Sequence, residues 1–197
     1  MFNDISTPLS LLRTRRSGRP RDLVAPGPDA RELRRIFEIA ARTPDHGKLA
    51  PWRFIHVAGD DREAFSQMLE AAYRGEKAEA PGRLEVEAVQ RFARQAPELV
   101  VLISSPVEGT KIPVWEQELS CGAAAMNLLL AAHALGFAGG WVTGWAAYSP
   151  AVFRGLGAHS GERIAGFIFL GTPAVALEER PRPDLDSVVS AWSPPSP

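Results

Sequence analysis

The sequence has a single cysteine, Cys121, and four histidines that stand far apart. One cysteine cannot form an intramolecular disulfide, which fits a reducing compartment, and we expect a cytoplasmic protein. The histidines lack the spacing of metal ligands, so we expect no metal site. Motifs of serine hydrolases, zinc proteases, P-loop proteins and Rossmann dinucleotide-binding proteins are also missing. Acidic pairs such as Glu116 and Glu118 lie on different faces of an expected helix, so no catalytic acid or nucleophile stands out.

The chain also carries little excess charge of either sign, with a formal net charge of -1 over 197 residues. Such a balance gives no overall attraction to nucleic acid or to an anionic membrane, and we expect neither as a partner. The shares of hydrophobic and charged residues, 45% and 23%, are ordinary for a soluble globular protein. The first residues lack the pattern of a secretory signal. We therefore expect one domain over residues 1–197.

The longest apolar stretch begins near Trp115 and ends at a glycine-rich segment before Trp145. Between residues 121 and 138 only Asn127 and His133 interrupt a run that is dense in alanine. Acidic residues precede this run and no lysine or arginine flanks it, so it fits a membrane span poorly. A helix that is apolar nearly all round is normally buried. We expect a central core helix around which a sheet and the other helices pack, and which a second subunit could share.

Helical spacing, helix caps and apolar runs predict the remaining elements. The first helix begins at Pro8 with Thr7 as its N-cap, and residues 9, 11 and 12, all leucine, are expected to supply a buried side. Asp29 and Glu32 form a capping box for the next helix. The other helices are expected at residues 29–42, 60–74, 83–95 and 150–156. Strands are expected at residues 53–58, 99–103 and 164–170.

Three segments suit a ligand. Residues 13–19 include four arginines, which are equally explained by a solvated helix end, but Arg15-Arg16-Ser17 would also suit a phosphate. The loop at residues 43–52 contains His46, although a lone histidine is more often structural. The glycine-rich segment around Trp141 is expected to form a turn where a flat ligand approaches the backbone. Together these features favour a bound cofactor that carries the chemistry while the protein orients it.

The order of these motifs resembles the nitroreductase family of FMN-dependent oxidoreductases, and most closely its small subgroup with a Pro-Asp-His loop. Each motif is weak alone, but the ordered set spans nearly the whole chain. The matching segments are residues 15–17, 44–46, 51–54, 115–118, 127–129, 140–144 and 169–173.

This resemblance implies an α+β fold, with a mixed sheet flanked by helices around the long central helix, and an intertwined homodimer that binds FMN at the subunit interface. The arginine segment and an arginine of the tail, Arg180 or Arg182, would contact the flavin phosphate and ribityl chain. His46 would reach the flavin from one subunit, and the segment after Gly140 would line the ring. The implied cofactor-binding residues are Arg15, Arg16, Ser17, His46, Lys48, Ala50, Trp141, Val142, Thr143, Gly144 and Arg182.

One departure concerns the residues just before the Pro51-Trp52 pair. Many relatives have asparagine and glutamine there, whose amides bond the flavin edge, whereas this chain has Lys48 and Ala50. Ala50 can make no side-chain hydrogen bond. Lys48 could offset that loss with a positive charge near the reduced flavin.

The implied activity is hydride transfer from NADH or NADPH to flavin N5, and then to a small electron-poor acceptor such as a nitroaromatic or a quinone. This chemistry requires no catalytic side chain. One alternative is a different enzyme at the same flavin site, which fragments the flavin or oxidises a specific metabolite. The other is a flavin-binding protein without catalytic activity.

Overall fold

Strand β3 (Glu98–Ser104) lies in the middle of the sheet and is buried on both faces. In the computed structural model, which describes residues 2–194, the odd-numbered residues among 99–103 pack into one apolar core. The even-numbered residues pack into a second core on the other face. A strand that is covered on both sides has no polar face, which explains why this segment reads as a continuous apolar run.

The sheet has five strands in the order β1-β5-β3-β2, with β4 paired to β5. The long strand β5 is thus hydrogen-bonded to three others. Helices together with this sheet confirm the predicted α+β class. All strand pairs within residues 2–194 are antiparallel, whereas a mixed sheet was expected. The strands are β1 (Leu23–Val24), β2 (Trp52–Val57), β3, β4 (Ala138–Val142) and β5 (Arg163–Pro173).

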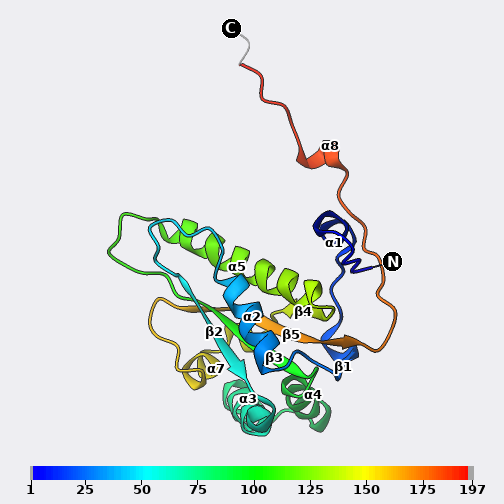
Figure 1. The fold of residues 1–197 in the computed structure, drawn as a ribbon. Coiled ribbons are helices and arrows are strands. Elements are labelled where there is room, and N and C mark those ends of the chain that lie inside the picture. Colours follow the sequence, from blue (N-terminus) through cyan, green and yellow to red (C-terminus); the bar gives the residue numbers. More distant parts are fainter. Residues whose placement is uncertain (1, 195–197) are drawn as a thin grey trace.

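Helices cover both faces of the sheet (Figure 1). The first group, α2 (Ala30–Ala40) and α5 (Val114–Ala134), packs on the core formed by the even residues of β3. The second group packs on the other core and contains α3 (Arg62–Glu76), α4 (Arg83–Ala93), α6 (Trp145–Tyr148) and α7 (Pro150–Gly155). Short helices α1 (Pro8–Thr14) and α8 (Leu185–Val188) lie near the two ends of the chain. Within residues 2–194 no helix has the length and apolarity needed to cross a membrane.

The predicted helix starts are confirmed at two places. The hydroxyl of Thr7 accepts a hydrogen bond from the Ser10 amide at the start of α1. Asp29 and Glu32 form the expected capping box at the start of α2. The buried side predicted for α1 is only partly correct, because Leu11 is buried whereas Leu9 and Leu12 are exposed.

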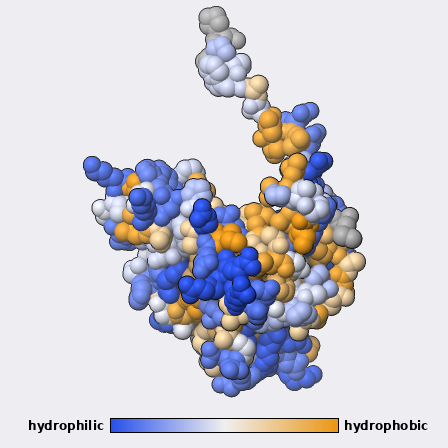
Figure 2. All heavy atoms as spheres, in the orientation of Figure 1, coloured by the Kyte–Doolittle hydropathy of each residue, from blue (hydrophilic) through white to orange (hydrophobic). Residues whose placement is uncertain are grey.

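Helix α5 is buried on one side only, contrary to the expectation that its own chain would wrap it. An apolar stripe on the opposite side is exposed or half-buried. Figure 2 shows apolar surface on the side of the molecule where Figure 1 draws α5, and again on the projecting tail. This stripe consists of Trp115, Leu119, Ala123, Met126 and Leu130.

The tail follows its own chain only up to about residue 180. The Ala174 amide donates to the carbonyl oxygen of Asp22, which continues the edge next to β1. Residues 181–194 are all exposed and lead away from the body of the molecule (Figure 1). This last part of the tail therefore does not lie on the surface of its own chain.

Candidate functional site

The segment Arg15–Gly18 leaves α1 and crosses the C-terminal end of α5 beside β4. The Gly18 amide donates to the Gly139 carbonyl oxygen at 3.1 Å. A side chain at Gly140 would place its Cβ 2.5 Å from the Gly18 carbonyl oxygen, so glycine permits this close approach. The predicted turn at residues 139–142 is thus wrong, because these residues form a strand in which Gly140 makes room for the backbone of Gly18.

His133 holds the same segment from within α5. Its Nε2 lies 3.0 Å from the carbonyl oxygen of Arg16, and its side chain is fully buried. Burial lowers the pKa of His133 below its ordinary value, against the opposite effect of the Leu129 and Arg16 carbonyl oxygens at its two ring nitrogens.

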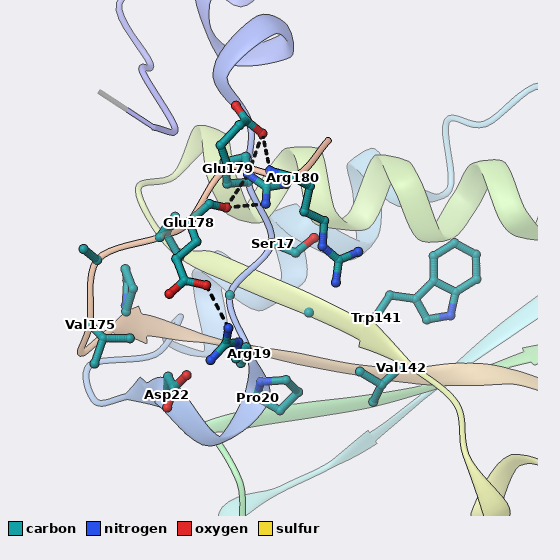
Figure 3. Close-up of a pocket in the computed structure, with 16 residues that line it drawn as sticks. Ser17, Arg19, Pro20, Asp22, Trp141, Val142, Val175, Glu178, Glu179 and Arg180 are labelled. Carbon is teal, nitrogen blue, oxygen red and sulfur yellow. Dashed lines mark hydrogen bonds and ion pairs between the residues drawn. The ribbon is translucent and has the colours of Figure 1, made fainter. Parts of the chain in front are cut away.

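A cavity of about 250 Å³ opens between this segment, the end of β4 and the tail (Figure 3). Its walls come from residues 16–20 and 22, residues 140–142 and residues 173 and 175–180. Figure 3 shows the Arg180 side chain extending from the tail towards Ser17 and Trp141. The structure therefore brings the predicted Arg16, Ser17, Trp141 and Val142 to one cavity.

The arginines of this cavity are held by the tail. The Arg16 side chain is only 6% exposed, and its Nε donates to the Glu178 carbonyl oxygen at 2.8 Å. The same Nε lies 3.1 Å from the Glu179 carboxylate. Arg19 forms an ion pair with the Glu178 carboxylate at 2.8 Å. Two acidic side chains thus occupy part of a site that sequence analysis assigned to a phosphate.

The predicted Arg15 lies beside this cavity but is not among the residues that line it. Its Nη1 donates to the Ser17 hydroxyl at 3.3 Å, and within residues 2–194 it forms no ion pair with a carboxylate. Burial, followed by the charges of Arg182 and Arg16, lowers the pKa of Arg15. Guanidinium groups that repel one another in this way gain most from an anion that several of them can contact.

Trp141 stands at the edge of the cavity in a fixed orientation. Its indole Nε1 donates to the Ala165 carbonyl oxygen at 3.0 Å, while 40% of the residue stays exposed. A Cβ at Gly166 would lie 2.2 Å from that nitrogen, so glycine makes room for the ring. Thr143 and Gly144 line a different cavity, of about 330 Å³, between α3 and α4. The structure thus separates these two residues from the arginine cavity.

The predicted Pro-Asp-His loop has a backbone that its sequence did not reveal. Lys48 and Ala50 have φ values of 56° and 48°, in the left-handed region that residues other than glycine rarely adopt. The Asp45 carboxylate accepts hydrogen bonds from the amides of Leu49 and Ala50, at 3.1 and 2.7 Å. These hydrogen bonds hold the strained backbone of the loop in place, and strained backbone of this kind is common at functional sites.

Three contacts attach this loop to α5 between Glu116 and Asn127. The Asn127 amide donates to the Thr43 hydroxyl at 2.8 Å. The Ser120 hydroxyl donates to the Pro44 carbonyl oxygen at 2.6 Å, and Nδ1 of His46 lies 2.7 Å from the Glu116 carboxylate. The arginine cavity lies at the other end of the helix, near His133. The 17 steps along α5 from Glu116 to His133 span about 25 Å at 1.5 Å per residue. One chain therefore does not bring His46 and the arginine cavity together.

Sequence analysis missed several members of these groups. Glu116 was treated only as part of an acidic pair that does not converge, yet it pairs with a residue 70 positions away. Glu178 and Glu179 contact an arginine more than 160 positions earlier in the chain. Local patterns carry no signal for contacts of this kind. The buried His133 could have been noticed as one of only two residues that interrupt the apolar run at residues 121–138.

Comparison with known proteins identifies the family of this chain. The chain matches the model of the nitroreductase family over residues 12–172. It is 36% identical to YdjA of Escherichia coli K12, which is named as a candidate NAD(P)H nitroreductase, over 165 residues that cover 84% of this chain and 87% of that protein. A nitroreductase-like family protein from Bacillus cereus has a similar structure, with 19% identity, a TM-score of 0.77 and coverage of 98% of this chain and 97% of the other. A candidate nitroreductase from Desulfovibrio desulfuricans, solved in complex with FMN, is 22% identical with a TM-score of 0.71 and coverage of 96% and 99%. The chain belongs to the nitroreductase family.

Proposed function

We propose that this protein is an FMN-dependent NAD(P)H oxidoreductase whose acceptor is a small electron-poor molecule such as a nitroaromatic or a quinone. Bound FMN would supply the hydride chemistry, taking a hydride at N5 from NADH or NADPH and passing it on. The observation that carries the proposal is the cavity that brings Arg16, Ser17, Arg180 and Trp141 together in a chain of this family, with Arg15 bonded to Ser17 beside it. Membership of the subgroup with the Pro-Asp-His loop remains a prediction.

The phosphate end of FMN fits the arginine cavity. A phosphate monoester carries nearly two negative charges at neutral pH and three acceptor oxygens, which suit the forks of Arg15, Arg16, Arg180 and Arg182 and the Ser17 hydroxyl. The volume of about 250 Å³ is below the roughly 300–1,000 Å³ of sites that enclose a whole ligand of this size. The cavity therefore suits one end of the cofactor, and the ring would extend along the exposed side of Trp141.

The remaining predicted contacts follow the direction of the chain. Beyond Trp141 the strand continues through Val142 to Thr143 and Gly144, and we propose that this segment lines the flavin ring. Amide N–H groups of such a segment can stabilise negative charge that develops on a reduced ring. Thr143 and Gly144 also bound the cavity between α3 and α4, so the ring would lie between the two cavities.

A second copy of the chain would complete the site. His46 lies about 25 Å along α5 from the arginine cavity, counted from its partner Glu116 to His133, so His46 and its loop neighbours Lys48 and Ala50 would act on the same cofactor from a partner. The exposed apolar stripe of α5 lies between the two groups. A two-fold axis through its middle, near Ala123 and Met126, would place the loop of one copy beside the arginines of the other. The proposed assembly is accordingly a homodimer with FMN at the interface.

The first test uses purified protein and its absorption spectrum. We expect bound FMN, identified by mass after heat release, and loss of its absorbance when NADH or NADPH is added without oxygen. Arg16→Gln should release FMN, whereas the matched variant Arg13→Gln should not, because Arg13 is exposed and lies outside the cavity. Protein that binds no flavin would refute the proposal. FMN that neither nucleotide bleaches would instead support the flavin-binding alternative.

The second test concerns the dimer. A Cβ added at Gly122 meets no atom within 4 Å in the isolated chain, and the helix gains by losing a glycine. Gly122→Leu should therefore leave the fold intact while it separates the copies and weakens FMN binding. Gly75→Ala, at another open position in a helix, serves as the control. Sedimentation of the variant as a dimer with full FMN content would contradict the proposed interface.

A further inference from the structure

His46 and Glu116 form an exposed pair that stability does not explain. Their side chains are 65% and 40% exposed, and Nδ1 of His46 lies 2.7 Å from Oε2 of Glu116. Exposed ion pairs typically contribute about 0–1 kcal/mol to stability. The surrounding loop is nonetheless held in a conformation that is costly for two of its residues. A strained backbone that is held in this way indicates that the position of the His46 imidazole matters for function.

The contacts around the pair fix the imidazole at α5. The backbone before His46 is held by Ser120, and the backbone after it is held by the Asp45 carboxylate. Ile112, from the segment before α5, packs against Gly47 on the other side, since a Cβ at that glycine would lie 3.3 Å from its side chain. Glu116 then meets one ring nitrogen, and the other nitrogen, Nε2, remains available to a ligand.

We propose, resting on the function above, that His46 donates a proton to the electron acceptor and that Glu116 is the positioning residue for it. A carboxylate at Nδ1 accepts that N–H and fixes the ring orientation. The proton to be delivered then sits on Nε2, on the side of the ring away from the carboxylate. In the proposed dimer, His46 would therefore supply an acid next to the FMN that the other copy binds.

The reaction with a quinone shows why a proton is needed. Uptake of one hydride adds two electrons and one hydrogen nucleus to the quinone and gives a hydroquinone monoanion. One proton from Nε2 of His46 then bonds to the anionic oxygen, which yields the neutral hydroquinone and neutral His46. Because both members of the pair are exposed to solvent, water can return the proton between turnovers.

Other charges near this loop are few and can be named. The loop itself carries Asp45 and Lys48, the segment before α5 carries Lys111, and α5 carries Glu118 next to Glu116. Asp45 is engaged by backbone amides, and Glu118 lies 3.9 Å from Arg163. The pH dependence of the acceptor step should therefore change most when the carboxylate at position 116 is removed.

The kinetic experiment separates the two halves of the reaction by stopped flow on FMN-loaded protein. Reoxidation by p-benzoquinone should slow by about 10²-fold in His46→Gln, the usual contribution of a general acid. Glu116→Gln should slow it by about tenfold and shift its pH profile, Glu116→Asp should restore part of the rate, and the double variant should resemble His46→Gln. Bleaching by NAD(P)H and reoxidation by ferricyanide, which takes electrons without protons, are measured on the same variants, and the rate with p-benzoquinone should fall relative to both.

A second readout needs no cofactor turnover. In flavin-free protein, at a pH where the imidazole of His46 is neutral, nitrogen NMR should identify the tautomer with the remaining proton on Nδ1, assigned by its loss in His46→Gln. Glu116→Gln should shift this signal towards a mixture of tautomers, and the control Glu118→Gln should not. This measurement remains informative even if the proposed oxidoreductase activity fails.

Several results would overturn the inference. Glu116→Gln with wild-type quinone kinetics and an unchanged imidazole signal would remove any role for the carboxylate. Equal slowing with quinone and ferricyanide, or loss of FMN from both variants, would mean that the pair is structural. By contrast, wild-type protein that binds no FMN would refute the proposed function itself, which is a separate outcome.

Discussion

Replacement of Arg15 by glutamine should change ligand-free stability and cofactor affinity in opposite directions. In the ligand-free chain Arg15 is partly buried beside Arg182 and Arg16, whose charges contribute to the lowering of its pKa. Removal of its charge relieves that repulsion, and an effect of at most about 1 kcal/mol is typical for partly exposed charges. For a chain of this length, such a gain corresponds to a rise in Tm of about 2–4 °C.

The cost should appear when FMN binds. A hydrogen bond to a charged group contributes roughly 1.5–3 kcal/mol, and about 1.4 kcal/mol corresponds to a factor of ten in affinity. Arg15→Gln should therefore weaken FMN binding by about 10- to 100-fold. Riboflavin lacks the phosphate, so its affinity should stay almost the same. Arg13→Gln removes the same charge from an exposed position of α1 and should affect neither ligand.

The assay combines two measurements on flavin-free protein. Thermal unfolding, followed by circular dichroism, gives the change in Tm, and quenching of flavin fluorescence gives the dissociation constants of FMN and riboflavin. A fall in Tm together with equal weakening of both ligands would refute the reasoning, because Arg15 would then support the fold rather than the phosphate. Unchanged FMN affinity would refute it as well.

Three other predictions follow from single side chains. Glu179→Gln should raise FMN affinity about two- to fivefold in the same titration, because its carboxylate competes with phosphate for Arg16 across 3.1 Å; lower affinity would contradict this. Arg53 holds the pKa of Glu162 at about 2 against an ordinary 4.5, so this pair contributes on the order of 3 kcal/mol above pH 4.5 that is lost as pH falls towards 2. Urea unfolding should accordingly show a flatter acid limb for Glu162→Gln, and parallel limbs would disprove the assignment. Arg62→Met should lower the free energy of unfolding by about 3 kcal/mol or more with an unchanged urea m-value, because its buried guanidinium donates to four backbone carbonyl oxygens; a loss below about 1 kcal/mol would be inconsistent with that role.

Sequence patterns predicted those elements whose signals are local. The capping box at Asp29 and the N-cap at Thr7 are formed by residues a few positions apart, and both are observed. The buried strand β3 was recognisable because a strand covered on both faces has no polar side. These features depend on neighbouring residues and not on which distant segment packs against them.

Strand β4 shows what local patterns cannot convey. Its glycines suggested a turn, since glycine disfavours regular strands. In the structure Gly140 is required by the backbone of Gly18, and Gly166 of β5 is required by the ring of Trp141. Each glycine therefore reports a close neighbour that is distant in sequence. Trp141 and Val142 line the arginine cavity, whereas Thr143 and Gly144 line the cavity between α3 and α4, and the predicted contacts of all four with a ligand stay a prediction.

The two sides of α5 are both apolar, but only one of them is buried in the core of the chain. A helix with no polar face gives no indication of which side its own chain covers. The structure assigns one side to the core through residues such as Leu128 and leaves Trp115 exposed on the other. The Pro-Asp-His loop contacts α5 between Glu116 and Asn127, whereas the arginine cavity lies near His133, so the rise per residue puts His46 about 25 Å from the cavity. In the dimer that we propose, a second copy that runs antiparallel to the first would bring the two groups together. The same apolar pattern would then serve a core and an interface, and the small residues on the exposed side, such as Gly122, are the positions where two helices could come closest.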